Sequence, residues 1–340
     1  MTLPEFNCLP TMIGSLPHTD AAAACRLVAR YLTDIPAWPQ LPKRSFKENM
    51  LAQFSQGLPG AAFEGEGISI SSQDNEEALA ELYAASIENR TDDYALTPEH
   101  AAGFFCFVKT EGLQPLAVKG QLTGPVTLGL GLVDLSRRAI IYDETLADAA
   151  ARLLRLKAAW QEKALRKLSN RTIIFLDEPA MASYGSSYVS LSKERILSLL
   201  GEVLGGLKGI KGIHCCGNTE WSLILETSTD VLSFDAYNYA TSLPLYPEAV
   251  RGFLAREGTI AWGIVPSEEK PLAEETVASL KDRLEEAIAP FTHQGIEFKY
   301  LLRRSLLTPS CGLGMLSEDA AEQALKLTAE LSIKMRKSYL

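Results

Sequence analysis

Short apolar runs recur along the chain, and longer stretches with the apolar spacing of helices separate them. Runs of this length, bounded by Gly, Pro or polar residues, are typical of buried β-strands. They cover residues 9–15, 37–41, 116–122, 172–177, 211–216, 231–236, 259–265 and 305–310. Strands that alternate with helices predict a parallel sheet, and eight such units favour closure into an α/β (β/α)8 TIM barrel.

The stretches between these runs carry signals for helix starts. Asp20, Ser192 and Ser317 each stand directly before a helical pattern, and residues 97–99 (TPE) offer a cap, a first-turn proline and an early acid. The last helix is expected to run from residue 317 to about 337. Residues from about 42 to 111 exceed what one connection needs, so we expect an elaborated insertion within a single catalytic barrel domain spanning residues 1–340.

Composition excludes several classes of protein. The 340 residues include 33 Lys and Arg against 42 Asp and Glu, a net charge of −9, and no basic run suggests a nucleic-acid partner. No stretch of about 18 apolar residues and no signal-peptide pattern occurs, so we expect a soluble, cytoplasmic protein without membrane contact. Six cysteines are too few for a disulfide framework in a chain of this length, which leaves core packing, metal binding or nucleophilic chemistry.

The polar residues at the strand ends include a possible metal site. His214 and Cys216 are two residues apart, so they face the same side of a strand, whereas Cys215 faces away. Barrel closure would bring Cys311, at the end of the last strand, close to them. One imidazole and two thiolates suit zinc, which in catalytic sites keeps an exchangeable fourth position. Asp235 is a candidate fourth ligand, although an acid at a strand end caps a helix as often. The alternative is a hydrogen-bonded core histidine among buried thiols.

Five motifs in order give the chain a recognisable pattern. They are residues 11–17 (TMIGSLP), 119–127 (KGQLTGPVT), 176–180 (LDEPA), 214–216 (HCC) and 311–313 (CGL). Together they resemble the C-terminal catalytic half of cobalamin-independent methionine synthase, including its short, folate-independent core forms. The wider superfamily of barrels includes uroporphyrinogen decarboxylase and methylcobalamin:coenzyme M methyltransferases.

The resemblance implies a zinc site and a binding site for homocysteine. The family's zinc ligands fall on His214, Cys216 and Cys311, with Asp235 where the family has a longer glutamate. Ile13-Gly14-Ser15 would hold the amino-acid end of homocysteine, and Asp177 would pair with its ammonium group. Asp177 and His214 are therefore the candidate catalytic residues. The family's second ammonium-binding glutamate would fall near Ala52 and Gln53, where no carboxylate stands.

The methyl donor is indicated by two departures from the folate-using enzymes. Residues 128–132 (LGLGL) lack the family's tryptophan, and residues 263–268 (GIVPSE) lack the histidine that serves proton transfer to folate. Without that general acid, methyltetrahydrofolate is a poor donor, which favours a methylcorrinoid such as methylcobalamin. None of His18, His100, His214 and His293 lies in a corrinoid-binding Asp-x-His-x-x-Gly motif. We therefore expect the corrinoid to arrive on a separate protein.

The expected function is zinc-dependent methyl transfer from a methylcorrinoid to the thiol of homocysteine, which yields methionine. Three alternatives stay open: transfer to coenzyme M or another thiol, a folate donor, and a non-catalytic zinc- or corrinoid-binding protein. Tetrapyrrole decarboxylation is a further alternative, but it would need several basic residues in the site. Only the pairs at 43–44 (KR) and 303–304 (RR) are candidates for that role.

Overall fold

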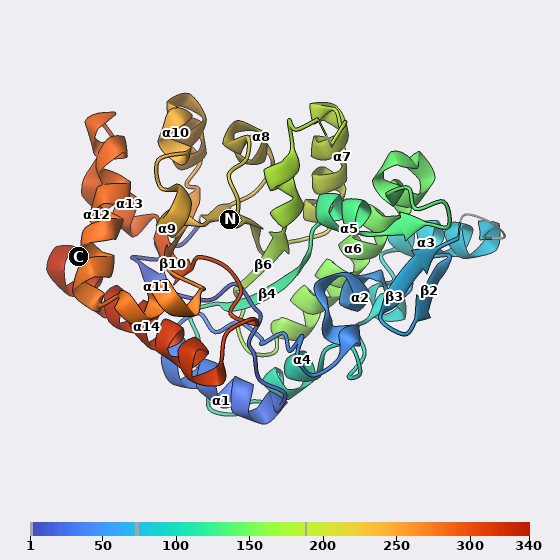
Figure 1. Ribbon diagram of the computed structural model, residues 1–340, viewed down its shortest axis with the longest axis horizontal. Helices are drawn as coiled ribbons and strands as arrows, with labels where there is room; N and C mark the ends of the chain where they lie inside the picture. The colour runs from blue at the N-terminus through green and yellow to red at the C-terminus, as the bar shows by residue number, and fades with distance from the viewer. Residues whose placement is uncertain (1–2, 72–74, 188) are drawn as a thin grey trace.

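The fold is an α/β barrel built on parallel strands. The computed structural model describes residues 3–71, 75–187 and 189–340. Seven strands form one sheet in the order β1-β10-β9-β8-β7-β6-β4, and every neighbouring pair is parallel. They are β1 (Leu9–Pro10), β4 (Val118–Thr123), β6 (Thr172–Asp177), β7 (Ile210–Cys215), β8 (Val231–Phe234), β9 (Thr259–Val265) and β10 (Ser305–Pro309). Figure 1 shows these strands at the centre with helices arranged around them.

Residues 37–40 complete the barrel between β1 and β4. Isolated bridges pair Ser15 with Gln40 and Ala37 with Lys119, both in parallel. The backbone N–H of Gln40 donates to the Gly14 carbonyl at 3.0 Å. All eight runs predicted from the sequence therefore contribute to the barrel wall, and the expected TIM-barrel fold is confirmed.

The helices begin largely where their capping residues predict. Side chains of Asp20, Ser192 and Ser317 each accept a hydrogen bond from a first-turn amide. The predicted start at residue 97 is wrong, because α4 begins only at Ala102 and Thr97 instead bonds the His100 ring at 2.8 Å. The helices are α1 (Ala21–Tyr31), α2 (Met50–Ser55), α3 (Glu76–Glu88), α4 (Ala102–Phe107), α5 (Pro125–Gly131), α6 (Glu144–Leu165), α7 (Lys193–Leu204), α8 (Trp221–Glu226), α9 (Ala236–Tyr239), α10 (Pro247–Ala255), α11 (Glu269–Glu274), α12 (Val277–His293), α13 (Phe298–Arg303) and α14 (Glu318–Tyr339).

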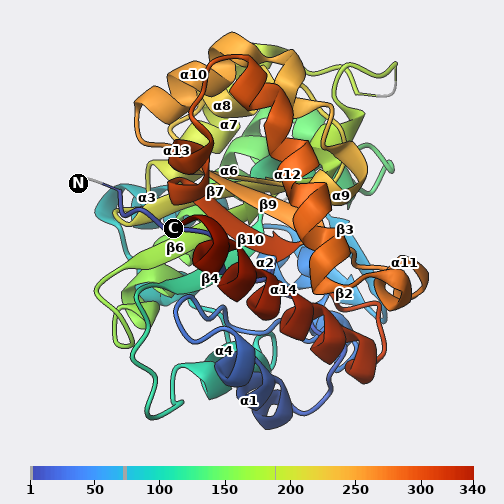
Figure 2. The ribbon, with the colours of Figure 1, turned by 90° about the vertical axis from the view of Figure 1, so that its left-hand side faces the viewer.

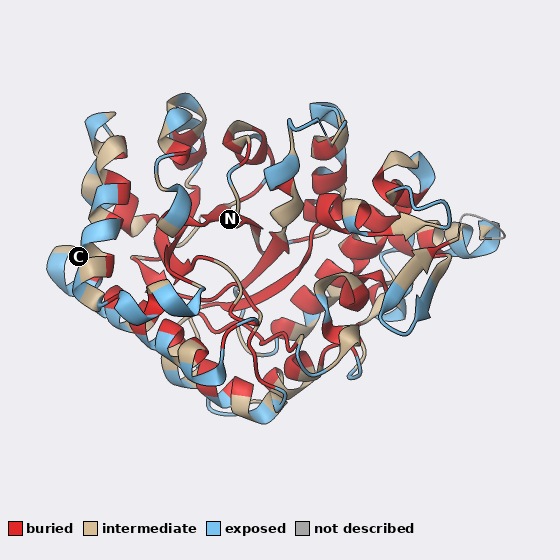
Figure 3. Cartoon of the chain, in the orientation of Figure 1, coloured by how far each residue is buried: buried red, intermediate tan, exposed pale blue. Residues whose placement is uncertain are grey.

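The barrel interior changes from apolar to polar along its axis. Residues that enter near the amino ends of the strands, among them Leu9, Ile173 and Leu306, form one buried apolar cluster. A larger apolar cluster lies between the strands and the helices, and Figure 3 shows the strands buried while the outer helix faces are exposed. Toward the carboxyl ends the inward residues become polar, as with Asp177 and His214. Apolar burial therefore stabilises the barrel at the amino ends of the strands, and the polar carboxyl ends are where TIM barrels carry their active sites.

The segment from residue 42 to 111 forms structure of its own beside the barrel. Here β2 (Ala61–Glu64) and β3 (Gly67–Ile70) pair antiparallel, and β3 pairs with β5 (Val133–Asp134). This small sheet lies at one edge of the molecule (Figure 1). The short 3-10 helix η1 (Phe46–Glu48) and α2 precede it and reach the barrel mouth. In the view of Figure 2, α14 runs across the front of the barrel.

None of the helices in the described part of the chain is both long enough and apolar enough to cross a lipid bilayer.

Candidate active site

A cavity of about 350 Å³ lies at the carboxyl ends of the strands, where TIM barrels carry their chemistry. Its wall combines the strand ends with η1 and the start of α2. The lining residues are Ile13, Ser15, Gln40, Pro42, Glu48, Asn49, Met50, Asp177, Pro179, His214, Cys216, Cys311, Gly312, Gly314 and Met315. Six of the eight residues named from the sequence as zinc or acceptor contacts line this cavity: Ile13, Ser15, Asp177, His214, Cys216 and Cys311. The other two, Gly14 and Asp235, do not line it.

Three potential metal ligands meet in the cavity. Ligand atoms of His214, Cys216 and Cys311 all lie within 4.8 Å of one another. In tetrahedral zinc sites with Zn–S distances of about 2.3 Å, neighbouring ligand atoms lie about 3.7 Å apart. The spacing is therefore within about an ångström of that of a zinc-bound site. Cys215 points to the other side of the strand, where it is buried and donates to the Gly217 carbonyl at 3.4 Å.

The His214 ring is oriented by the neighbouring strand. Its Nδ1 lies 3.0 Å from Ser233 Oγ, and the two residues are register partners on β7 and β8. Its Nε2 is buried and has no hydrogen-bond partner among the described residues. A Nδ1–H that donates to Ser233 leaves the Nε2 lone pair free to bind a metal. The donor set and its support therefore fit zinc.

The two thiols influence each other's ionisation. A hydrogen bond with Cys311 lowers the pKa of Cys216, and the same bond raises the pKa of Cys311 together with burial. Such a pair titrates as a unit, because ionising one thiol makes it harder to ionise the other. A divalent cation between the sulfurs would relieve this competition, since metal-bound thiols are deprotonated.

Asp235, named from the sequence as a zinc ligand or a helix cap, caps a helix in the structure. Its Oδ1 accepts from the Asn238 amide at 2.9 Å, and its Oδ2 accepts from Asn238 Nδ2 at 2.7 Å. It is thus the N-cap of α9. It is not among the three residues whose ligand atoms converge. The geometry supports helix capping at Asp235 and gives no support to a fourth zinc ligand there.

The segment around Ser15 connects β1 to the loop that carries Cys311. Ser15 Oγ accepts from the Gly314 amide at 3.2 Å and keeps its own proton to donate into the cavity. Gly14 does not line the cavity, and it packs closely against Gln121. A Cβ at Gly14 would stand 2.6 Å from the Gln121 side chain. The glycine predicted as a substrate contact is therefore needed to make room for Gln121.

Asp177 and Glu48 are two acids in the cavity wall. Oδ1 of Asp177 and Oε2 of Glu48 are buried, and neither has a hydrogen-bond partner among the described residues. Burial raises the pKa of Asp177, and the Lys119 ammonium opposes this shift. Burial also raises the pKa of Glu48, and Arg44, whose Nη1 lies 2.5 Å from Glu48 Oε1, opposes it.

Glu48 is a cavity residue that the sequence did not predict. Ala52 and Gln53, where the resemblance would place a second acid, are fully buried in α2, and the acid that lines this part of the cavity is Glu48 of η1. In the sequence, Ser45 followed by Glu48 has the spacing of a helix-capping box, which would assign Glu48 a structural role. The side chain is instead paired with Arg44 and faces the cavity.

Glu178, next to Asp177, stabilises the floor of the site. Its carboxylate accepts from the Val126 and Thr127 amides at 2.9 and 2.7 Å and from Thr127 Oγ1 at 2.6 Å. Its own amide donates to the His214 carbonyl at 2.7 Å. Glu178 therefore joins the start of α5 to the end of β7, and its role is structural.

Comparisons with known proteins show the fold. No protein-family model matches the chain, and no curated protein matches it in sequence. Among matching solved structures is a B12-independent methionine synthase from Shewanella sp. W3-18-1 in complex with selenomethionine, with a TM-score of 0.64, 17% identity, and coverage of 97% of this chain and 98% of that chain.

Two further matches have lower TM-scores. A putative vitamin-B12 independent methionine synthase from Listeria monocytogenes gives 0.55 at 16% identity, over 93% of this chain and 86% of that chain. A methyltransferase from Methanosarcina mazei gives 0.54 at 13% identity, over 99% and 94%. At such identities the likeness establishes a shared barrel fold.

Proposed function

We propose that this protein is a zinc-dependent thiol S-methyltransferase that converts homocysteine to methionine. The observation that carries the proposal is the convergence of His214, Cys216 and Cys311 within 4.8 Å in the wall of a cavity at the catalytic end of the barrel. Three protein ligands, rather than four, leave a position for the acceptor sulfur, as catalytic zinc sites do. The fold neighbours, described as two methionine synthases and a methyltransferase, support the same chemistry.

Zinc held by these three residues would act as a Lewis acid that lowers the pKa of the acceptor thiol. A free thiol with a pKa of about 8.5 is roughly 3% ionised at pH 7, so full ionisation gains only about 2 kcal/mol. Near-attack positioning of two reactants contributes about 7–11 kcal/mol. The residues that hold the acceptor, Ser15 and Asp177 among them, therefore matter at least as much as the zinc ligands.

The charge of the cavity favours an amino-acid acceptor over an anionic thiol. The described lining residues include two acids, Asp177 and Glu48, and no lysine or arginine. The ammonium group of homocysteine would satisfy the buried oxygens that lack partners. Its carboxylate would accept from the Ser15 hydroxyl. Coenzyme M, whose tail is a sulfonate, would bring a like charge toward both acids and is disfavoured.

The donor in this proposal is a methylcorrinoid supplied by a separate protein. The acceptor sulfur would form a bond to the methyl carbon, the cobalt–carbon electron pair would stay on the corrinoid, and the thiol proton would pass to solvent. The lack of a folate-protonating histidine in residues 263–268 supports this donor. The description of two fold neighbours as B12-independent weighs toward folate, so both donors belong in the test.

The test is methyl transfer by zinc-loaded protein to homocysteine, from either methylcobalamin or methyltetrahydrofolate. We expect transfer from methylcobalamin, and we expect Cys311→Ala to abolish it. Cys215→Ala is the matched control, because this buried thiol adjoins Cys216 but points away from the cavity. Full activity in a Cys311→Ala protein that has lost its zinc would refute the proposal, and transfer from folate alone would refute the donor.

A further inference from the structure

Three alternate residues of β4 hold the cavity wall in place. Lys119, Gln121 and Thr123 are buried on the inner face of the strand, and each donates a hydrogen bond to a backbone carbonyl of a neighbouring segment. The bonds run from Lys119 Nζ to the Ile13 oxygen (2.5 Å), from Gln121 Nε2 to the Trp38 oxygen (2.9 Å) and from Thr123 Oγ1 to the Met50 oxygen (2.6 Å). Ile13 and Met50 line the cavity, and Trp38 is two residues from Gln40, which also lines it.

These bonds occur where the strand ladder is weakest. Between β1, residues 37–40 and β4, the backbone pairing consists of isolated bridges rather than continuous ladders. Side chains of β4 therefore supply bonds that a regular sheet would supply through its backbone. Lys119 thus adds a side-chain bond to the few backbone bonds that hold the cavity wall near Ile13.

Of the three side chains, only that of Lys119 can carry a charge. Its ammonium is fully buried and also lies 3.2 Å from Gln121 Oε1 and 4.3 Å from the centre of the Phe175 ring. Burial lowers the pKa of Lys119, and the Asp177 carboxylate opposes this shift. A buried charge costs free energy unless it is paired. Methionine would fill the same space without that cost, so packing alone does not account for the lysine.

The placement of Asp177 accounts for the charge. Asp177 ends β6 and is the register partner of Thr123, so it lies on the strand next to Lys119 and nearer the mouth. The cavity above also holds Glu48 and two thiols, all of which are negative when ionised. A positive charge beneath Asp177 offsets their mutual repulsion and favours the ionised form of the carboxylate.

We infer that Lys119 is a positioning residue of the acceptor site, which fixes the Ile13 carbonyl and provides the buried counter-charge of Asp177. The inference rests on the proposed function, because it assigns the acceptor to the wall formed by Ile13 and Asp177. Lys119 does not line the cavity, so it acts through these two residues and does not touch the acceptor.

The test compares two buried lysines by equilibrium binding of L-methionine to zinc-loaded protein, measured calorimetrically. Lys157 of α6 is also fully buried, bonds Gln56 Oε1 and the Tyr94 carbonyl at 3.3 and 3.4 Å, and is not a cavity residue. We expect Lys119→Met to weaken methionine binding about tenfold or more with its zinc content unchanged. We expect Lys157→Met to lower stability without changing the affinity.

A double-mutant cycle separates positioning from general structural damage. If Lys119 acts through Asp177, Lys119→Met will cost less affinity in an Asp177→Asn background than in the wild type, whereas independent effects would add. Lys119→Gln, which keeps a donor without the charge, replaces Lys119→Met if that variant does not fold.

The outcomes distinguish this inference from the proposed function. Three results would overturn the inference. The folded Lys119 variant could bind methionine with wild-type affinity, Lys157→Met could lose as much methionine affinity as Lys119→Met, or the wild type could fail to bind methionine. A wild type that binds methionine with this Lys119 dependence but transfers no methyl group would overturn the proposed function alone.

Discussion

His214 Nδ1 and Ser233 Oγ lie 3.0 Å apart at paired positions of β7 and β8. Both residues are buried, so the strand register, rather than a flexible loop, sets the direction of the imidazole. This contact leaves Nε2 as the free ring nitrogen. Partners of this kind orient the ligand and raise its basicity in metal sites.

Removal of the Ser233 hydroxyl should weaken zinc binding. Ser233→Ala is expected to lower zinc affinity about tenfold, because the ring loses its orienting partner while all three ligands remain. Competition with a chromogenic chelator measures the change. Ser305→Ala is the control, since that buried hydroxyl bonds Trp262 at 2.8 Å and lies outside the cavity. Equal zinc affinity in the Ser233 variant and the wild type would show that the contact has no part in metal binding.

Glu48 should contribute to selection of the acceptor head group. Glu48→Gln keeps the shape of the side chain and removes its charge, so the preference for L-methionine over 3-(methylthio)propanoate should fall about tenfold. Calorimetric binding of both ligands measures the preference. Glu99→Gln is the control, because Glu99 pairs with Lys47 close by but does not line the cavity. An unchanged ratio in Glu48→Gln would remove Glu48 from the acceptor site.

Gly124 should be required for the packing of Glu178. A Cβ at Gly124 would stand 2.2 Å from Glu178 Oε1, which already accepts from the Val126 amide. Gly124→Ala should therefore lower the free energy of unfolding by about 1–3 kcal/mol, as overpacking does. Gly201→Ala in α7, where a Cβ meets nothing within 4 Å, should raise it by about 0.5–1 kcal/mol. Urea unfolding measures both, and a neutral Gly124 variant would contradict the account.

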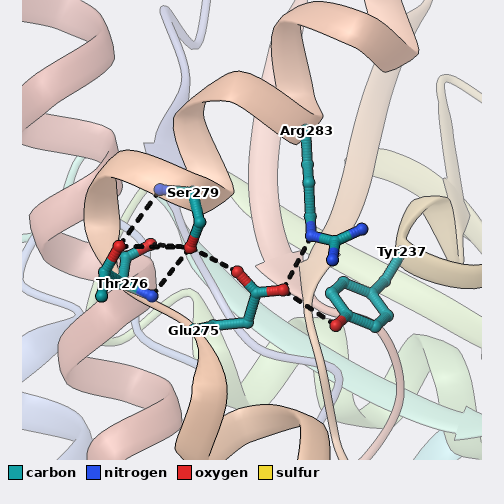
Figure 4. Close-up of polar contacts among 5 residues, drawn as sticks. All are labelled: Tyr237, Glu275, Thr276, Ser279 and Arg283. Atoms are coloured by element: carbon teal, nitrogen blue, oxygen red, sulfur yellow. Dashed lines mark hydrogen bonds and ion pairs between the residues drawn. The ribbon is translucent and has the colours of Figure 1, made fainter.

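Glu275 connects Tyr237 of α9 to the start of α12, as Figure 4 shows. Its carboxylate accepts from Tyr237 at 2.9 Å and from Arg283 Nε at 2.7 Å, and the nearby Ser279 belongs to the capping box of α12. Burial alone would raise the pKa of Glu275, but hydrogen bonds from Ser279 and Tyr237 and the Arg283 charge lower it overall. Because the folded-state pKa lies below the unfolded value of about 4.3, the stabilisation is present above that pH and is lost as pH falls further.

Glu275→Gln should accordingly destabilise the protein by about 1–3 kcal/mol at pH 7 and by less at acidic pH. Urea unfolding of variant and wild type at several pH values measures the difference. A difference that stays constant from pH 7 to below about 4 would contradict the assigned ionisation.

The strands and the His214–Cys216 pair were accessible from the sequence, because both follow from local patterns. Apolar runs mark buried strands whatever their partners, and the two-residue spacing of His214 and Cys216 fixes their common side. Cys311 followed only once barrel closure was assumed. Its convergence with the other two confirms the geometric expectation, while zinc itself stays a prediction.

The parts that were missed depend on contacts that local pattern does not encode. Glu48 belongs to a short 3-10 turn whose position over the cavity is set by packing of the 42–111 segment. Asp235 could have been a ligand or a cap, and the neighbouring Asn238, which bonds both its oxygens, favours the cap. Lys119 lay within a recognised motif, but its partners Ile13 and Asp177 are distant in sequence.

X-ray absorption at the zinc edge, with and without homocysteine, tests the central claim most directly. The account predicts one zinc per chain with one nitrogen and two sulfur ligands from His214, Cys216 and Cys311, and a third sulfur once homocysteine is added. Protein that retains no zinc, or a sulfur count that does not change when homocysteine binds, would contradict it.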